Sequence, residues 1–195
     1  MALERIVMHW TAGGNSANQT DLKHYHEIVE GDGTRVLGNH RPEANISTAD
    51  GVYAAHTRAF NTGAIGLSVA GMAGAEPHPF KAGNSPINST QLAVFVEMVA
   101  EYAETYNIEI NRKNVLTHAE VQITHGVAQA GKWDITWLPG MKRPGDPIEV
   151  GDQLRKMIIE VHTRNFGRVA ERSDRDRPME ALLSRLVDLL EKERA

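Results

Sequence analysis

The sequence predicts an α/β protein in which short buried strands alternate with amphipathic helices. Two observations carry this prediction: short apolar runs that end in glycine-rich or polar loops, and longer segments whose apolar residues recur every three to four positions. Of the 195 residues, 41% are apolar and 24% are charged, and no internal repeat is visible. We therefore expect one principal domain, over residues 1–170.

The strands are expected in four places. Residues 3–8 form an apolar run with β-branched Ile6 and Val7, and the loop that follows would present His9. Residues 25–29 and 35–37 flank an Asp-Gly step, which favours a hairpin turn. The remaining runs, at 64–70 and at 114–117 with His118 at its end, resemble buried strands, and the polar stretches 38–62 and 71–88 are interpreted as loops.

Two segments show helical spacing. Ser89 or Thr90 would cap a helix over residues 91–106, whose apolar stripe contains Leu92, Val96, Val99, Ala103 and Tyr106. A second helix is expected over residues 152–165.

Residues 171–195 form a separate unit, a charged linker followed by an amphipathic helix. Thirteen of these twenty-five residues are charged, and Pro178 suits a first helical turn. The apolar stripe consists of Met179, Leu182, Leu183, Leu186, Leu189 and Leu190. It would dock on its own domain or form a homodimer. Binding to a membrane surface is less well supported, because the polar face has charges of both signs.

Composition excludes several classes of function. The formal net charge is −4 without any basic block, which argues against nucleic acid or an anionic membrane as a partner. No apolar run reaches the ~18 residues that span a bilayer, so stable membrane insertion is not expected. Charged residues interrupt the apolar start of the chain, which therefore lacks a secretory signal pattern. With no cysteine, any metal must be held by His, Asp or Glu, and the chain has nine histidines. No Walker or Rossmann pattern is present.

Three separated residues could share one metal ion. His9 and His118 each end an expected strand, and Asp134 follows sixteen residues after His118. Side chains at the ends of adjacent strands, about 4.8 Å apart, can reach one ion. Two imidazoles and one carboxylate match an open catalytic zinc site. Spacing alone leaves the alternative open that each histidine is a surface or hydrogen-bonded core imidazole.

Four short segments add a pattern in a specific order. They are residues 6–12 around His9, residues 25–34 from Tyr-His to an Asp-Gly-Thr turn, residues 55–66 with Ala-His, Asn61 and Ile-Gly, and Thr117-His118 followed by Lys132-Trp133-Asp134. Together they resemble the type 2 N-acetylmuramoyl-L-alanine amidases, the zinc amidase fold of bacteriophage amidase-type lysozymes and peptidoglycan recognition proteins. The resemblance covers about residues 6–134.

The resemblance implies a mixed central β-sheet flanked by helices, with a zinc site in a groove at the strand ends. Position by position, His9, His118 and Asp134 match the family's zinc ligands, so one Zn²⁺ per chain is the implied cofactor. Lys132 matches a lysine that faces the reacting carbonyl, and Tyr25 matches a tyrosine at the zinc site of phage-type members.

The implied reaction is hydrolysis of the amide between N-acetylmuramic acid and L-alanine in peptidoglycan. Zinc lowers the pKa of bound water toward about 7 and polarises the carbonyl, and Lys132 would add a fixed cation where negative charge develops. Tyr25 as a general base would need a pKa well below about 10. Some bacterial members carry a glutamate on the strand where this chain has Ser68, so the identity of the base stays open.

Five further residues are weaker candidates. His56 and Asn61 would line the substrate groove or hold a loop by hydrogen bonds, and Glu120 would orient a ligand imidazole or cap a helix. Trp10 and Trp133 adjoin expected ligands and would contact substrate or form the pocket wall.

Several functional alternatives remain. A non-catalytic peptidoglycan-binding module would have lost zinc ligands, whereas all three are present here. A zinc peptidase with a different scissile amide and a cytosolic amidase of cell-wall recycling are the other candidates. The tyrosine variant favours a phage-type endolysin, made in the cytoplasm of a bacterial host and acting on periplasmic peptidoglycan, or on its muropeptides, after release.

Overall fold

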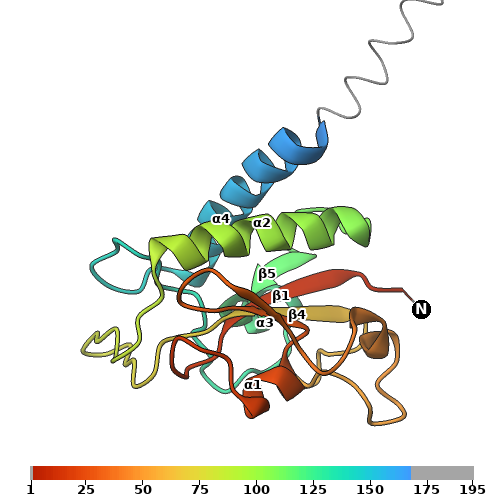
Figure 1. The fold of residues 1–195 in the computed structure, drawn as a ribbon, viewed down its shortest axis with the longest axis horizontal. Helices are drawn as coiled ribbons and strands as arrows, with labels where there is room; N and C mark the ends of the chain where they lie inside the picture. Colours follow the sequence, from red (N-terminus) through yellow and green to blue (C-terminus); the bar gives the residue numbers. More distant parts are fainter. Residues whose placement is uncertain (1, 168–195) are drawn as a thin grey trace, which may run out of the picture.

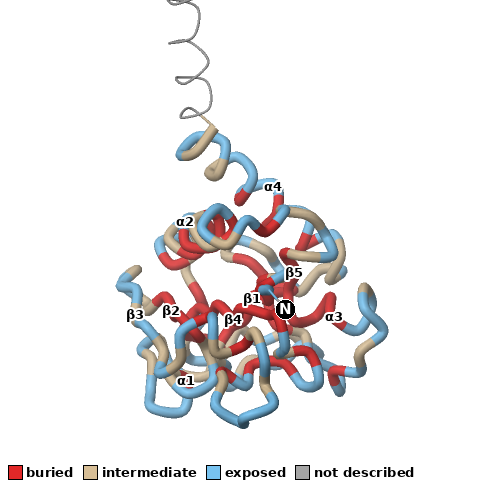
Figure 2. Tube along the Cα trace, turned by 90° about the vertical axis from the view of Figure 1, so that its right-hand side faces the viewer, coloured by how far each residue is buried: buried red, intermediate tan, exposed pale blue. Residues whose placement is uncertain are grey.

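A five-stranded mixed sheet forms the centre of the protein, whose computed structural model describes residues 2–167. The strand order is β3 (Arg35–Leu37), β2 (Glu27–Val29), β4 (Ala64–Val69), β1 (Arg5–Trp10) and β5 (Val115–Thr117) (Figures 1 and 2). All neighbouring pairs are parallel except β2 and β3, which form an antiparallel hairpin. The prediction of an α/β fold with a mixed sheet flanked by helices is confirmed.

Helices cover both faces of this sheet. The long helices α2 (Ser89–Thr105) and α4 (Pro147–His162) lie on one side, and the short helix α1 (Gln19–His24) lies on the other (Figure 1). Helix α3 (His118–His125) follows β5 directly, and a π-helical turn, Thr163–Gly167, extends α4. Within residues 2–167, no helix is long and apolar enough to cross a membrane.

Strands β1, β2, β4 and β5 are almost entirely buried, whereas the edge strand β3 is largely exposed (Figure 2). Side chains alternate between the two faces of a strand. Ile6, Met8 and Trp10 therefore belong to the large apolar core that also contains Phe95 and Leu154 from α2 and α4. The opposite face of β1 contributes Val7 to a smaller cluster, and His9 has the same orientation as Val7. Alternation thus directs His9 away from the main core.

Five segments differ from the sequence prediction. Strand β1 extends to Trp10, so His9 lies inside a strand and is fully buried instead of being presented by a loop. Helix α4 begins at Pro147, five residues before the predicted start, because Asp146 caps it and proline suits its first turn. Helices α1 and α3, and a 3₁₀ turn at Pro42–Ile46, lie in segments for which no helix was predicted. They are too short to show a clear helical period.

The predicted linker and amphipathic helix of residues 171–195 lie outside the described residues. The same holds for the predicted domain boundary at residue 170 and for the dimer contact assigned to that helix.

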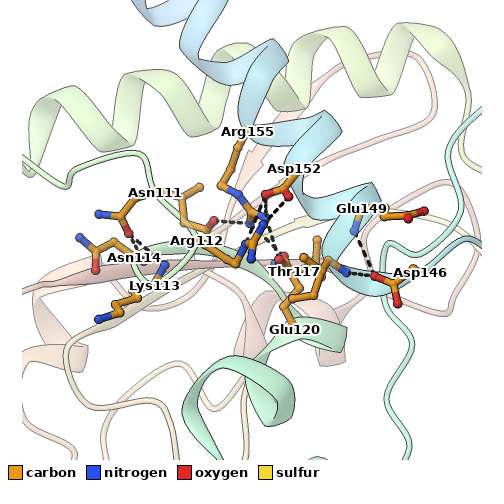
Figure 3. A network of polar contacts seen from close by, with 12 residues as sticks. Asn111, Arg112, Lys113, Asn114, Thr117, Glu120, Asp146, Glu149, Asp152 and Arg155 are labelled. Carbon is orange, nitrogen blue, oxygen red and sulfur yellow. Dashed lines mark hydrogen bonds and ion pairs between the residues drawn. The ribbon is translucent and has the colours of Figure 1, made fainter.

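A buried ion pair connects α4 to the start of α3. The Arg155 guanidinium, from α4, contacts both carboxylate oxygens of Glu120 at 2.8 and 3.1 Å and donates to the carbonyl of Val115 at 3.0 Å. It also reaches Asp152 at 2.7 Å, and Glu120 in turn accepts from the backbone N–H of Thr117 at 2.7 Å (Figure 3). The network therefore fixes the junction of β5 and α3, where His118 lies.

Candidate metal centre

Three side chains from separate elements converge below the carboxyl ends of the central strands. His9 lies in β1, His118 is the first residue of α3 directly after β5, and Asp134 lies in the loop between α3 and α4. Because β1 and β5 are parallel neighbours, their carboxyl ends meet at one edge of the sheet. The three buried residues each offer one ligand atom, and these atoms all lie within 4.8 Å of one another.

The spacing of the donor atoms fits a tetrahedral metal ion. Oδ2 of Asp134 lies 3.4 Å from Nδ1 of His9 and 3.2 Å from Nδ1 of His118. Ligand bonds of about 2.0–2.1 Å at tetrahedral angles place neighbouring donors about 3.3 Å apart. Nδ1 of His9 is fully buried and has no hydrogen-bond partner among the described residues, a costly condition that a metal ion would relieve. The donor set of two nitrogens and one oxygen is one that Zn²⁺ accepts.

The protonation states suit a metal as well. Burial lowers the pKa of His9 to about 4, so this imidazole is neutral at pH 7. Burial alone would raise the pKa of Asp134, but the adjacent imidazoles of His118 and His9 outweigh it and hold that pKa below its usual range. A neutral imidazole and an ionised carboxylate are the forms that bind a metal.

A second buried imidazole, that of His56, contacts Nε2 of His9, the ring nitrogen opposite Nδ1. Nε2 of His56 lies 3.2 Å from the carbonyl oxygen of Ala64, which can only accept, so this nitrogen carries the proton. Nδ1 of His56 is therefore an acceptor, 3.2 Å from Nε2 of His9 and 2.8 Å from the hydroxyl of Thr57. His9 then donates from Nε2 and keeps a lone pair on Nδ1, toward Asp134. The ring of His56 lies against Gly66. A Cβ at this position would collide with the ring, so the glycine makes room for it.

A pocket of about 310 Å³ opens next to these three residues. Its lining includes Trp10, Tyr25, His56, Arg58 and Lys132, together with His118, Gln129 and Asp134. Lys132 is exposed, two residues before Asp134, so its ammonium group can reach a ligand in the pocket.

Tyr25 is half-buried beside His9, with ring centroids 5.2 Å apart. It ends helix α1 rather than starting a strand, and β2 begins two residues later. Burial raises the pKa of the Tyr25 hydroxyl, and the nearby Asp134 carboxylate acts in the same direction. The structure therefore favours a neutral phenol that donates a hydrogen bond.

The weaker candidates separate into two groups. His56 contacts His9, and Trp10 lines the pocket, whereas Trp133 packs edge-on against Trp10 at 4.7 Å and is not part of the lining. Asn61 accepts hydrogen bonds from the backbone N–H groups of residues 56 and 57, so it holds the loop that carries His56. Of the two interpretations of Glu120, the structure shows the helix cap, at the start of α3. Its carboxylate is directed to Thr117 and Arg155 instead of a ligand imidazole.

One residue that contacts a candidate metal-ligating side chain was not identified from the sequence. Oε1 of Gln129 lies 2.9 Å from Nε2 of His118, and Gln129 is 4% exposed. Eleven residues separate the pair along the chain, and no local motif marks a glutamine as the partner of a histidine.

His26, the neighbour of Tyr25, faces the interior and lies outside the ligand set. Its Nδ1 accepts from the backbone N–H of Gly66 at 2.9 Å, and its Nε2 donates to Oδ1 of Asn45 at 3.1 Å. Burial lowers its pKa to about 4.

We expect His26 to make the protein sensitive to acid. The unfolded residue binds a proton below about pH 6.5, so between that pH and about 4 the unfolded state holds more protons and stability falls as the pH is lowered. In urea unfolding with a chelator present, His26→Gln should remove up to about 3 kcal/mol of the stability loss between pH 7 and 4. An unchanged pH dependence in the variant would contradict this expectation.

Comparison with known proteins identifies the family of the chain. A sequence profile of the Amidase_2 family, described as N-acetylmuramoyl-L-alanine amidase, matches residues 1–141. The chain therefore belongs to the N-acetylmuramoyl-L-alanine amidase family. A search of proteins with curated functions gave no match.

A search of solved structures found, among others, two amidases and one endolysin. The N-acetylmuramoyl-L-alanine amidase LysC from Clostridium intestinale URNW is 16% identical over 78% of this chain and 86% of its own, with a TM-score of 0.46. The Ph2119 endolysin from the Thermus scotoductus MAT2119 bacteriophage is 18% identical over 77% and 86%, with a TM-score of 0.44. AmiD from E. coli, in complex with the substrate anhydro-N-acetylmuramic acid-L-Ala-D-gamma-Glu-L-Lys, is 19% identical over 60% and 49%, with a TM-score of 0.44.

Proposed function

We propose that this protein is a zinc-dependent N-acetylmuramoyl-L-alanine amidase that cleaves the bond between N-acetylmuramic acid and L-alanine. The observation that carries the proposal is the buried group of His9, His118 and Asp134 beside an open pocket. The orphaned Nδ1 of His9 and the donor spacing support a metal at this point. Membership of the amidase family supports the choice of substrate.

The residues around this group match the needs of amide hydrolysis. Zn²⁺, when bound to the three ligands, would acidify a water molecule and polarise the amide carbonyl. Lys132 provides a positive charge at the mouth of the pocket, where the carbonyl oxygen becomes negative as water adds. Tyr25, as a neutral phenol, donates a hydrogen bond to the same oxygen or orients the attacking water. Trp10 and Ala55 contribute to the pocket wall that limits access of bulk water to the reacting bond.

We further propose a phage-type endolysin, because the site has the tyrosine and lacks the glutamate of some bacterial members. Ser68 pairs in register with His9 in the neighbouring strand, and its hydroxyl donates to the His9 carbonyl at 3.3 Å. Among the described residues, the pocket lining contains no glutamate. Such an enzyme would be made in the host cytoplasm and reach periplasmic peptidoglycan after release.

Metal removal provides the direct test. The purified protein should release new L-alanine amino termini from purified peptidoglycan and from soluble muropeptides, lose this activity with a chelator, and regain it with Zn²⁺. Mass spectrometry of the products should place the cut at the N-acetylmuramic acid–L-alanine bond. Release at another amide would identify a zinc peptidase, and binding without release would identify a non-catalytic module.

A further inference from the structure

We propose that Gln129 is a positioning residue that selects the metal-binding tautomer of His118. This inference rests on the zinc site proposed above and assigns a function to a residue outside the ligand set. The carbonyl oxygen of the Gln129 side chain lies 2.9 Å from Nε2 of His118. The opposite ring nitrogen, Nδ1, lies 3.2 Å from Oδ2 of Asp134, on the side of the donor group.

The neighbours of Gln129 determine which end of its amide faces the imidazole. Its Nε2 lies 3.0 Å from the carbonyl oxygen of Arg58 and 3.3 Å from that of Val127. Carbonyl oxygens only accept, so both protons of the amide nitrogen are directed to them. Oε1 therefore faces His118 and can only accept as well. Nε2 of His118 must carry the proton, which leaves a lone pair on Nδ1 for the metal.

The backbone of the same residue is also fixed. Its N–H donates to Oε1 of Gln122 at 3.0 Å, and its carbonyl accepts from the N–H of Lys132 at 3.2 Å. Between them, Ala130 and Gly131 have positive φ angles of 51° and 72°, which turn the chain toward the pocket. Every polar group of Gln129 thus has a partner, so the amide cannot flip without leaving buried groups unpaired.

The tautomer matters because metal binding uses a lone pair on a defined nitrogen. Without an acceptor at Nε2, the proton of the neutral imidazole can occupy either nitrogen, and the form protonated at Nδ1 cannot bind the ion. Loss of such an outer partner usually lowers metal affinity 10- to 100-fold, about the range expected here. Since the acceptor is a neutral amide, it orients the ring without adding a negative charge to the site.

The test uses full-length protein and two variants of matched chemistry. Gln129→Met removes the acceptor but keeps the length of the side chain. Gln122→Met removes the bond to the Gln129 backbone in the same loop but leaves the acceptor of His118 in place. In metal-free protein, ¹⁵N NMR at a pH where imidazoles are neutral should show His118 protonated at Nε2 in the parent and in Gln122→Met. In Gln129→Met it should show a mixture of tautomers.

Zinc affinity, measured against a competing chelator, should fall about 10- to 100-fold in Gln129→Met and stay near the parent value in Gln122→Met. If Gln129→Met does not fold, the parent protein alone still tests the inference, because a metal-free parent with His118 protonated at Nδ1 would overturn it. A parent-like tautomer and zinc affinity in Gln129→Met would overturn the inference, as would an equal loss in Gln122→Met. Failure of the parent itself to bind zinc would instead refute the proposed function, and the metal-free spectra would still report on Gln129.

Discussion

Lys132→Ala should lower the turnover of the amidase reaction by about 10²- to 10³-fold, the usual effect of removing one group that stabilises an oxyanion. Lys132 is exposed at the mouth of the pocket and is not a member of the ligand set, so zinc content and the free energy of unfolding should stay unchanged. The measurement is the rate of release of L-alanine amino termini at saturating substrate, together with metal analysis of the same preparation.

Two further variants test whether the loss of turnover is specific to the charge at Lys132. Lys142→Ala changes another exposed lysine, which is not part of the pocket lining, and should keep the parent rate. Lys132→Arg retains the charge and should keep part of the activity. Parent-like turnover in Lys132→Ala would exclude the lysine from oxyanion stabilisation. A loss of zinc from that variant would instead show that Lys132 supports the metal site.

Arg155→Met should lower the free energy of unfolding by about 3–5 kcal/mol, because it leaves a buried carboxylate without its cationic partner. Arg155 is 4% exposed and Glu120 is fully buried. Glu120 would retain only its hydrogen bond to the N–H of Thr117. Urea unfolding at pH 7 measures the loss.

The matched control removes an exposed pair from the same network. Arg112 also binds Asp152, at 2.6 Å, but both side chains are about half exposed. Exposed pairs contribute about 0–1 kcal/mol, so Arg112→Met should have little effect. Equal losses in the two variants would show that burial of the Arg155–Glu120 pair is not the source of its contribution.

The fold class could be predicted because the apolar patterns of the longer elements are strong. The strands of the sheet overlap the short apolar runs, and the long helices α2 and α4 overlap the segments whose apolar residues have helical spacing. The shorter helices α1 and α3 were missed, since six or eight residues complete about two turns and give no reliable period. Their boundaries depend instead on caps, such as Asn18 before α1 and Thr117 before α3.

The metal group could be proposed from the sequence only through the order of its surrounding motifs. Spacing gave no local signature for His9, His118 and Asp134. A histidine inside a buried strand also contradicts the usual apolar composition of parallel strands, so His9 was assigned to a loop. The partners of the ligands are still harder to predict. His56 and Gln129 act through contacts across 47 and 11 residues of chain, which only the folded structure defines.

The central place of β1 has a consequence for biosynthesis. Ile6 leaves the ribosome before both of its ladder partners, Ile65 on one side and Val115 on the other. Pairing over such sequence distances is slow and needs most of the chain. The nascent polypeptide must therefore expose an unpaired apolar strand until the partner strands have been synthesised, and chaperones can protect it from aggregation during this interval.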